Sequence, residues 1–318
     1  MSAQPGVSLP AADGLAAPPT SLWTDTRRNI LRHRVAQVGL VLLGALITVA
    51  IAAPIISTHE PNDTVGIDEG LLRPDAPPGL RGPCIHLLGC PADRPQHFFG
   101  IDRNGRDVYS RVLYGARISL LVGIATVGFA ILIGTVLGAV AGYAGGWMDN
   151  LIMRIMDVLL AFPSLILAIA MVTVLGPGLL NAALAIGIVG IPIYARVMRA
   201  SVLTIKERDF VVASRALGES PLGLLLRRIM PNALTPLIVV GTLGIAGAIL
   251  DVAALSFLGL GAQPPLAEWG SMIGLERNQL FSSPHLIIVP GIALSLSVLG
   301  FNLLGDGLRD ALDPRLNR

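Results

Sequence analysis

Long apolar stretches separated by short polar segments dominate this 318-residue chain. A helix that crosses a bilayer needs about 20 predominantly apolar residues, and each stretch is near that length. The predicted spans cover residues 35–56, 118–143, 151–175, 179–198, 234–258 and 286–304. A turn signal, Gly176-Pro177-Gly178, separates the third span from the fourth. The pattern therefore predicts an all-α integral membrane protein with six transmembrane helices.

Composition supports a membrane location. Hydrophobic residues make up 53% of the chain and charged residues 14%. Soluble domains carry about 25% charged residues, so we expect this chain to be surrounded by membrane lipid. The formal net charge is only +2, which argues against a nucleic-acid partner.

Basic residues in short loops indicate which loops stay in the cytoplasm. A cluster of arginines precedes the first span, at Arg27, Arg28, Arg32 and Arg34. An even number of spans returns the C-terminus to the same side, and the polar segment 206–231 lies on that side too. We therefore predict that both termini are cytoplasmic. The expected divisions are a disordered tail and basic flank (1–34), the first span (35–56), an extracytoplasmic loop (57–116), the transmembrane core (117–305) and a cytoplasmic tail (306–318).

The two cysteines of the chain, Cys84 and Cys90, both fall in the extracytoplasmic loop. An even number of cysteines on the oxidising side of a membrane favours a disulfide, with two free thiols as the alternative. His86 and His97 are near in sequence, but their spacing matches no zinc-binding template, so we predict no metal site.

Small residues recur within two spans. The second span has a glycine every four residues, at Gly134, Gly138 and Gly142. The fifth has a similar patch, at Gly241, Gly244 and Gly247. Such stripes allow close approach of helix backbones, so we interpret them as packing seams. The alternative is a pair of surfaces that slide during gating.

Two acidic residues fall within predicted spans, where charge is costly and often functional. Asp157 lies one helical turn after Arg154, and we expect these two to form an ion pair. Asp251 lies deep in the fifth span with no basic neighbour in sequence. It is therefore expected to face the bundle interior or a water-filled path, and it is the candidate residue for a substrate path.

Nucleotide hydrolysis by this chain is not predicted. A P-loop needs a Gly-Lys pair, and the single lysine, Lys206, follows Ile205. The spans contain no nucleophile–base or metal-ligand constellation, so the chain is not expected to be an enzyme. Two function classes remain: a membrane subunit driven by a separate ATPase, and an ion-coupled carrier or channel that uses Asp251. A carrier should show inverted repeats, and none is convincing here.

The polar segment 206–231 has the capping and helix-ending residues of two short helices. Gly218 stands where a first helix would end in a left-handed cap, and Ser220-Pro221 is typical of an N-cap followed by a first helical residue. Pro231 is expected to end the second helix. We interpret this helical elbow as a surface that a partner protein grips.

The elbow resembles the cytoplasmic "EAA" loop of ABC-importer permeases. The similarity is carried by Ala213-Ser214-Arg215-Ala216-Leu217-Gly218 and by residues 227–232, which include an Ile and a Pro at the family's positions. The family's glutamate falls on Val212 and its second alanine on Ser214. The resemblance implies that residues 213–218, with Ser220 and Pro221, couple the chain to an ATPase.

Further stretches are similar to permeases for dipeptides, oligopeptides and nickel, and to the second ("C") permease of such systems. These stretches are residues 99–108, 114–120, 157–164, 255–261, 264–265, 269–270 and 301–316. The family often has a glutamate where Val252 stands, one residue after Asp251. The loop with the two cysteines departs from the typical member.

This resemblance implies a type I importer permease in the bacterial inner membrane. The implied partners are a homologous second permease that forms the other half of the pore, two ATPase subunits and an extracytoplasmic substrate-binding protein. No cofactor is expected in this chain, because ATP and Mg²⁺ would be bound by the ATPase subunits.

Overall fold

The computed structural model describes residues 34–70, 82–86, 90 and 96–312. Within these residues the chain is helical and has no strand beyond two isolated bridges, Cys84 with His97 and Ile101 with Asp107. The all-α fold class is therefore confirmed. The predicted N-terminal tail falls almost entirely on residues 1–33, outside the described residues, whereas residues 306–312 of the predicted C-terminal tail continue helix α12.

Among the described residues, five helices are long and apolar enough to cross a membrane: α2 (Arg34–Ile56), α4 (Val108–Ala144), α7 (Leu179–Ile205), α10 (Met230–Phe257, continuous with residues 221–229) and α12 (His285–Leu312). The shorter elements are α3 (Val65–Asp68), α8 (Asp209–Ala216), α9 (Pro221–Gly223), a π-helical turn (Leu224–Ile229), α11 (Trp269–Glu276) and a 3₁₀ turn (Arg277–Gln279). Helix α4 begins ten residues before the predicted span, because Asp107 caps it by accepting from the backbone N–H of Ser110 at 2.8 Å.

The third predicted span is not one straight helix. Helices α5 (Gly146–Leu160) and α6 (Ser164–Leu175) meet at an angle of 90°. Pro163 lies at the bend, where its missing N–H and restricted backbone favour a break. Helix α5 is held against α7 by polar groups, since Arg199 donates to Asp149 over 2.6 Å. Counted as one broken span, this pair brings the candidate crossings among the described residues to six.

The expected pair between Asp157 and Arg154 is also wrong. Asp157 accepts instead from the guanidinium of Arg196 on α7, at 2.6 Å. The bend places α5 alongside α7, so a partner on the neighbouring helix replaces the partner on the same helix. Both side chains are about half exposed, at 51% and 54%, so this pair contributes little to stability.

The glycine stripe of α4 is a packing seam against α7. A Cβ at Gly134 would lie 2.8 Å from the Cβ of Tyr194, and one at Gly142 would lie 2.9 Å from the carbonyl oxygen of Arg199. A Cβ at Gly138 would overlap the carbonyl oxygen of Ala195. The two backbones touch here with no room for side chains, and dispersion between them holds the helices together.

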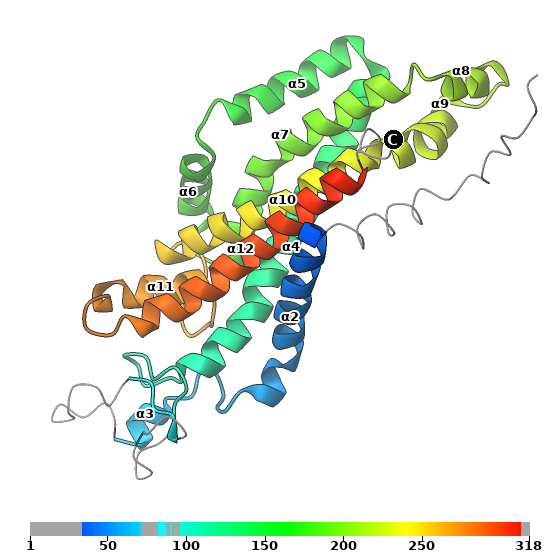
Figure 1. The fold of residues 1–318 in the computed structure, drawn as a ribbon. Coiled ribbons are helices and arrows are strands. Elements are labelled where there is room, and N and C mark those ends of the chain that lie inside the picture. The colour runs from blue at the N-terminus through cyan, green and yellow to red at the C-terminus, as the bar shows by residue number, and fades with distance from the viewer. Residues whose placement is uncertain (1–33, 71–81, 87–89, 91–95, 313–318) are drawn as a thin grey trace, which may run out of the picture.

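The helices place distant segments at two opposite ends of the bundle (Figure 1). Helix α2 packs against the end of α12, with Gly307 against Ala36, so the first and last described residues lie close together. The elbow with α8 and α9 lies at this same end, whereas α3 and α11 lie at the other. This arrangement agrees with an even number of crossings. The side of the membrane that each end faces stays a prediction.

Candidate coupling elbow and substrate path

The first half of the elbow ends in a Schellman turn. Helix α8 stops at Ala216, and Gly218 then adopts a left-handed backbone with φ of 85°. The N–H of Gly218 donates to Arg215 and the N–H of Glu219 donates to Ser214, at 3.0 and 3.2 Å. These two bonds satisfy carbonyls that a helix end leaves open, and glycine reaches this backbone without steric cost.

The second half begins with a capped helix. The Ser220 hydroxyl accepts from the N–H of Gly223 at 3.2 Å, and Pro221 occupies the first helical position. The helix then continues through the π-helical turn into α10 without a break. The expectation that Pro231 ends it is therefore wrong. The wider π-helical turn directly before Pro231 shifts the hydrogen-bond register, which accommodates a residue without an N–H.

Buried apolar side chains fix the elbow to the base of α10. Val211 of α8 and Ile229 of the π-helical turn are fully buried, and Leu224 is nearly so. An ion pair between Arg228 and Glu219, at 3.0 Å, closes the turn between the two halves. The elbow is therefore a folded unit that is continuous with the helix it precedes.

The outer surface of the elbow is apolar although most of it precedes the candidate span that begins at Pro221. Leu217 is 89% exposed and Leu222 65% exposed, with Val212 exposed beside them. Ala213 and Ala216 are exposed as well, and Arg215 stands at the rim. We name the surface formed by residues 212–222 the elbow knob. Exposed apolar patches of this kind mark contacts with another protein or with a membrane.

A second candidate site is a cavity of about 200 Å³ between α4, α6, α7 and α10. Its walls are mostly apolar, and Asp251 is among the residues that line it. Three hydroxyl side chains also line the cavity, those of Thr126, Ser164 and Tyr194. Sequence reasoning did not select these three, although hydroxyl groups in otherwise apolar spans were a signal it could have used.

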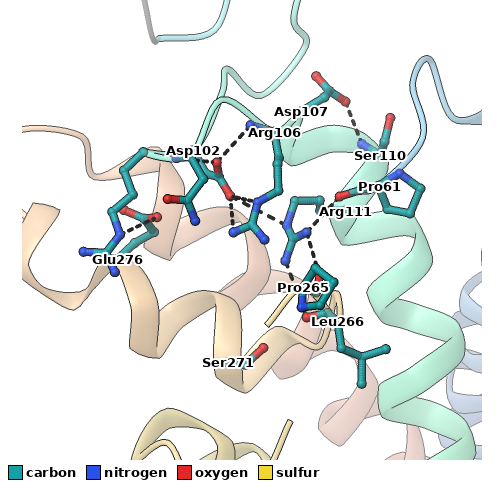
Figure 2. Close-up of polar contacts among 12 residues, drawn as sticks. Pro61, Asp102, Arg106, Asp107, Ser110, Arg111, Pro265, Leu266, Ser271 and Glu276 are labelled. Carbon is teal, nitrogen blue, oxygen red and sulfur yellow. Dashed lines mark hydrogen bonds and ion pairs between the residues drawn. The ribbon is translucent and has the colours of Figure 1, made fainter. Parts of the chain in front are cut away.

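The opposite end of the bundle is stabilised by a buried polar network (Figure 2). The Asp102 carboxylate accepts from the side chain of Arg106 at 2.6 and 2.7 Å, and Arg111 lies 3.8 Å away. Arg111 in turn donates to the backbone carbonyls of Pro61 and Pro265, at 2.8 and 3.2 Å. The network therefore ties α4 to segments about 50 and 150 residues away in sequence.

His97 joins three segments of the loop between α2 and α4. Its ring nitrogens lie 2.9 Å from carboxylate oxygens of both Asp107 and Glu69, and its backbone pairs with that of Cys84. Cys84 and Cys90 form a disulfide in the structure, with Cα atoms 5.4 Å apart. His59, His97 and Asp107 have ligand atoms within 4.8 Å of one another. However, an imidazole that donates from both nitrogens has no lone pair for a metal, so we interpret the cluster as an ion-paired histidine.

The stability of this loop should fall as pH rises. Burial alone lowers the pKa of His97, but the bonds to Asp107 and Glu69 outweigh burial and raise it above 6.5. The stabilisation is thus complete below pH 6.5 and is lost as pH rises through the raised pKa. Hydrogen-exchange protection factors of residues 97–107, which correct for the pH dependence of the intrinsic exchange rate, should be higher at pH 6 than at pH 8.5. His97→Gln should remove most of that difference, and an unchanged difference in the variant would contradict the assignment.

Thiol labelling tests both the disulfide and the orientation. A membrane-impermeant maleimide added to intact cells should label the protein only after treatment with a mild reductant, because the disulfide then opens on the outer side. Cys84→Ser should leave Cys90 free and labelled without reductant. Labelling of the wild type without reductant would contradict the disulfide. Labelling of Cys84→Ser only after the membrane is permeabilised would reverse the orientation.

Two family models match this chain. The model described as "Binding-protein-dependent transport system inner membrane component" covers residues 134–318, and the model of the "N-terminal TM domain of oligopeptide transport permease C" covers residues 21–78. The chain belongs to the binding-protein-dependent inner-membrane transport component family. The membership confirms the resemblance drawn from the elbow, and with it a permease that is not itself an enzyme.

Curated relatives of this permease are similar along nearly their whole length. The dipeptide transport system permease protein DppC of Alkalihalophilus pseudofirmus is 43% identical over 93% of this chain and 91% of its own. The di/tripeptide transport system permease protein DppC of Pseudomonas aeruginosa is 41% identical over 97% of both chains. The glutathione transport system permease protein GsiD of Escherichia coli is 43% identical over 92% of this chain and 91% of its own.

Solved structures support the fold of the permease. Two crystal forms of the inward-facing MetNI methionine ABC transporter contain a chain that matches 64% of this one. The TM-scores are 0.51 and 0.52, at 19% and 20% identity, and 96% and 97% of the solved chain is covered. These structures support the fold alone, and the role of this chain as a permease rests on the family models and the curated relatives. None of these comparisons supports the alternative of an ion-coupled carrier.

Proposed function

We propose that this permease forms half of the translocation pore of an importer for dipeptides and other short peptides. The relatives carry names for dipeptide, di/tripeptide and glutathione transport, and all of these solutes are short peptides. A homologous second permease would form the other half of the pore.

The elbow knob carries the proposed coupling to ATP. It combines a fixed turn at Gly218 with exposed apolar side chains such as Leu217, as expected of a knob that inserts into a groove of an ATPase subunit. Two such subunits would bind ATP and Mg²⁺, and an extracytoplasmic binding protein would deliver the peptide at the opposite end. In this arrangement the elbow and both termini face the cytoplasm of a bacterial inner membrane.

Movement of the elbow reaches the cavity through a single helix. Residues 221–257 form one continuous helix that begins in the elbow and carries Asp251 near its other end. When the ATPase subunits close on ATP, a displacement of the knob would tilt this helix and open or close the cavity. ATP can bias the two states only through contacts that differ between them, and the knob supplies such contacts.

Reconstitution of the whole complex tests the proposed function. Proteoliposomes with both permeases, both ATPase subunits, ATP inside and the binding protein outside should accumulate radiolabelled Ala-Ala. A P-loop lysine variant of the ATPase subunits should abolish the accumulation. Accumulation that follows a proton gradient and ignores ATP would favour the carrier instead, and an assembled complex that moves no dipeptide, tripeptide or glutathione would refute the proposal.

A further inference from the structure

The cavity between α4, α6, α7 and α10 contains a carboxylate without a counter-ion. Asp251 lines it, and no arginine, lysine or histidine does. Among the described residues no donor forms a hydrogen bond or an ion pair with Asp251, whereas Asp149 and Asp157 each have an arginine partner. A charged group in an apolar span is costly, so an unpaired one indicates that its partner is supplied from outside the chain.

Free space adjoins the carboxylate. Gly247 lies one helical turn before Asp251, on the same face of α10, and it also lines the cavity. A Cβ at Gly247 would meet no atom within 4 Å, unlike a Cβ at Gly241, which would lie 2.6 Å from Ile131. Helix α10 is therefore open beside Asp251 and packed at Gly241, nearly three turns earlier and on another side of the helix.

Thr126 adds an unpartnered hydroxyl to the cavity. Its side chain is only 3% exposed, and its hydroxyl oxygen has no hydrogen-bond partner. Other helical threonines in this chain donate to the carbonyl four residues earlier, as Thr173 and Thr242 do at 2.8 Å. Buried polar atoms are almost always hydrogen-bonded, so this oxygen lacks the partner that a buried hydroxyl normally has. Thr135 also lacks a partner but does not line the cavity.

These groups match a primary ammonium. An ammonium carries one positive charge and three N–H donors, and the cavity offers one carboxylate and several hydroxyl oxygens. The ring of Tyr194 can add a cation–π contact. The cavity volume, about 200 Å³, is below the roughly 300 Å³ at which pockets for drug-sized ligands begin. It therefore suits one end of a peptide and not the whole molecule.

We propose that this cavity binds the protonated amino terminus of a short peptide as it passes through the permease. Asp251 is the counter-ion, and Thr126 and Tyr194 accept the remaining N–H groups. This inference rests on the proposed function, because it names the part of the peptide that this site recognises.

A direct binding measurement tests the inference. The four-subunit complex in nanodiscs, without the binding protein, is titrated with Ala-Ala and with N-acetyl-Ala-Ala, which lacks the ammonium. Wild type should bind Ala-Ala at least about tenfold more tightly than the acetylated peptide, since a bond to a charged group is worth about this much. Asp251→Asn should remove that preference, Asp251→Glu should retain part of it, and Thr126→Val should reduce it less.

The matched control is Asp157→Asn, which removes a paired carboxylate on α5 and should leave the preference intact. Equal binding of the two peptides by wild type, or an unchanged preference in Asp251→Asn, would overturn the inference. Loss of permease pairing in Asp251→Asn, with Thr126→Val and Asp251→Glu binding as wild type, would also overturn it. Uptake measurements separate the two proposals. If wild type shows ATP-driven uptake and Asp251→Asn transports with an unchanged KM, only this inference is refuted. If wild type shows no uptake, the proposed function is refuted.

Discussion

Gly218→Val should uncouple ATP hydrolysis from peptide uptake and leave the membrane helices folded. The backbone at this position has a φ of 85°, where a non-glycine residue costs about 1–2 kcal/mol and a β-branched one is a strong outlier. A Cβ there would meet no atom within 4 Å, so the change strains the turn without a clash in the bundle. We expect the Schellman turn to open and the elbow knob to lose its shape.

The readouts are co-purification of the ATPase subunits, ATP hydrolysis and uptake of Ala-Ala in proteoliposomes. Uptake should fall by at least about tenfold, through release of the ATPase subunits or through hydrolysis that no longer moves peptide. Ala216→Arg should have a similar effect, because it places a long charged side chain on the knob while the turn stays intact.

Two controls separate shape from bulk. Gly218→Asn keeps a residue that tolerates the left-handed backbone, so it should retain more uptake than valine. Thr204→Arg adds the same bulk and charge as Ala216→Arg at an exposed position near the end of α7, outside the knob, and should have little effect. Normal uptake by both Gly218→Val and Ala216→Arg would rule out the knob as the coupling site.

Local signals in the sequence predicted much of the elbow, because caps depend on neighbouring residues. Gly218, Ser220 and Pro221 adopt the expected roles in the structure. Pro231 does not, since the π-helical turn that accommodates it leaves no clear mark in composition. A strong local signal, such as a proline expected to end a helix, can therefore be overridden by the backbone around it.

Features that depend on tertiary contacts were beyond the sequence. Pro163 marks the break between α5 and α6 in the sequence, but the position of α5 alongside α7 depends on the pairing of Asp149 with Arg199, 50 residues away. Arg111 contacts the carbonyl of Pro265 from across the fold. The cavity around Asp251 needs four helices to form, so neither its size nor its hydroxyl groups could be assembled from spacing alone.

Gly138→Leu should disrupt the seam between α4 and α7 and deplete folded protein. A Cβ at this position would overlap the backbone carbonyl of Ala195 and lie 2.8 Å from the Cβ of Met198. Neither neighbour can rotate away, because one is backbone and the other is the first atom of a fully buried side chain. Overpacking typically costs about 1–3 kcal/mol, and an overlap with backbone belongs at the upper end or above it.

Gly128→Leu is the matched control, since the same substitution in the same helix there meets no atom within 4 Å and points outward. The measurement is the yield of monodisperse protein in detergent and its midpoint of thermal unfolding, for both variants beside wild type. Gly138→Leu should lose most of the yield and lower the midpoint, while Gly128→Leu should resemble wild type. If Gly138→Leu folds with an unchanged midpoint but fails to transport, the stripe is a sliding surface for gating and the seam is not a fixed contact.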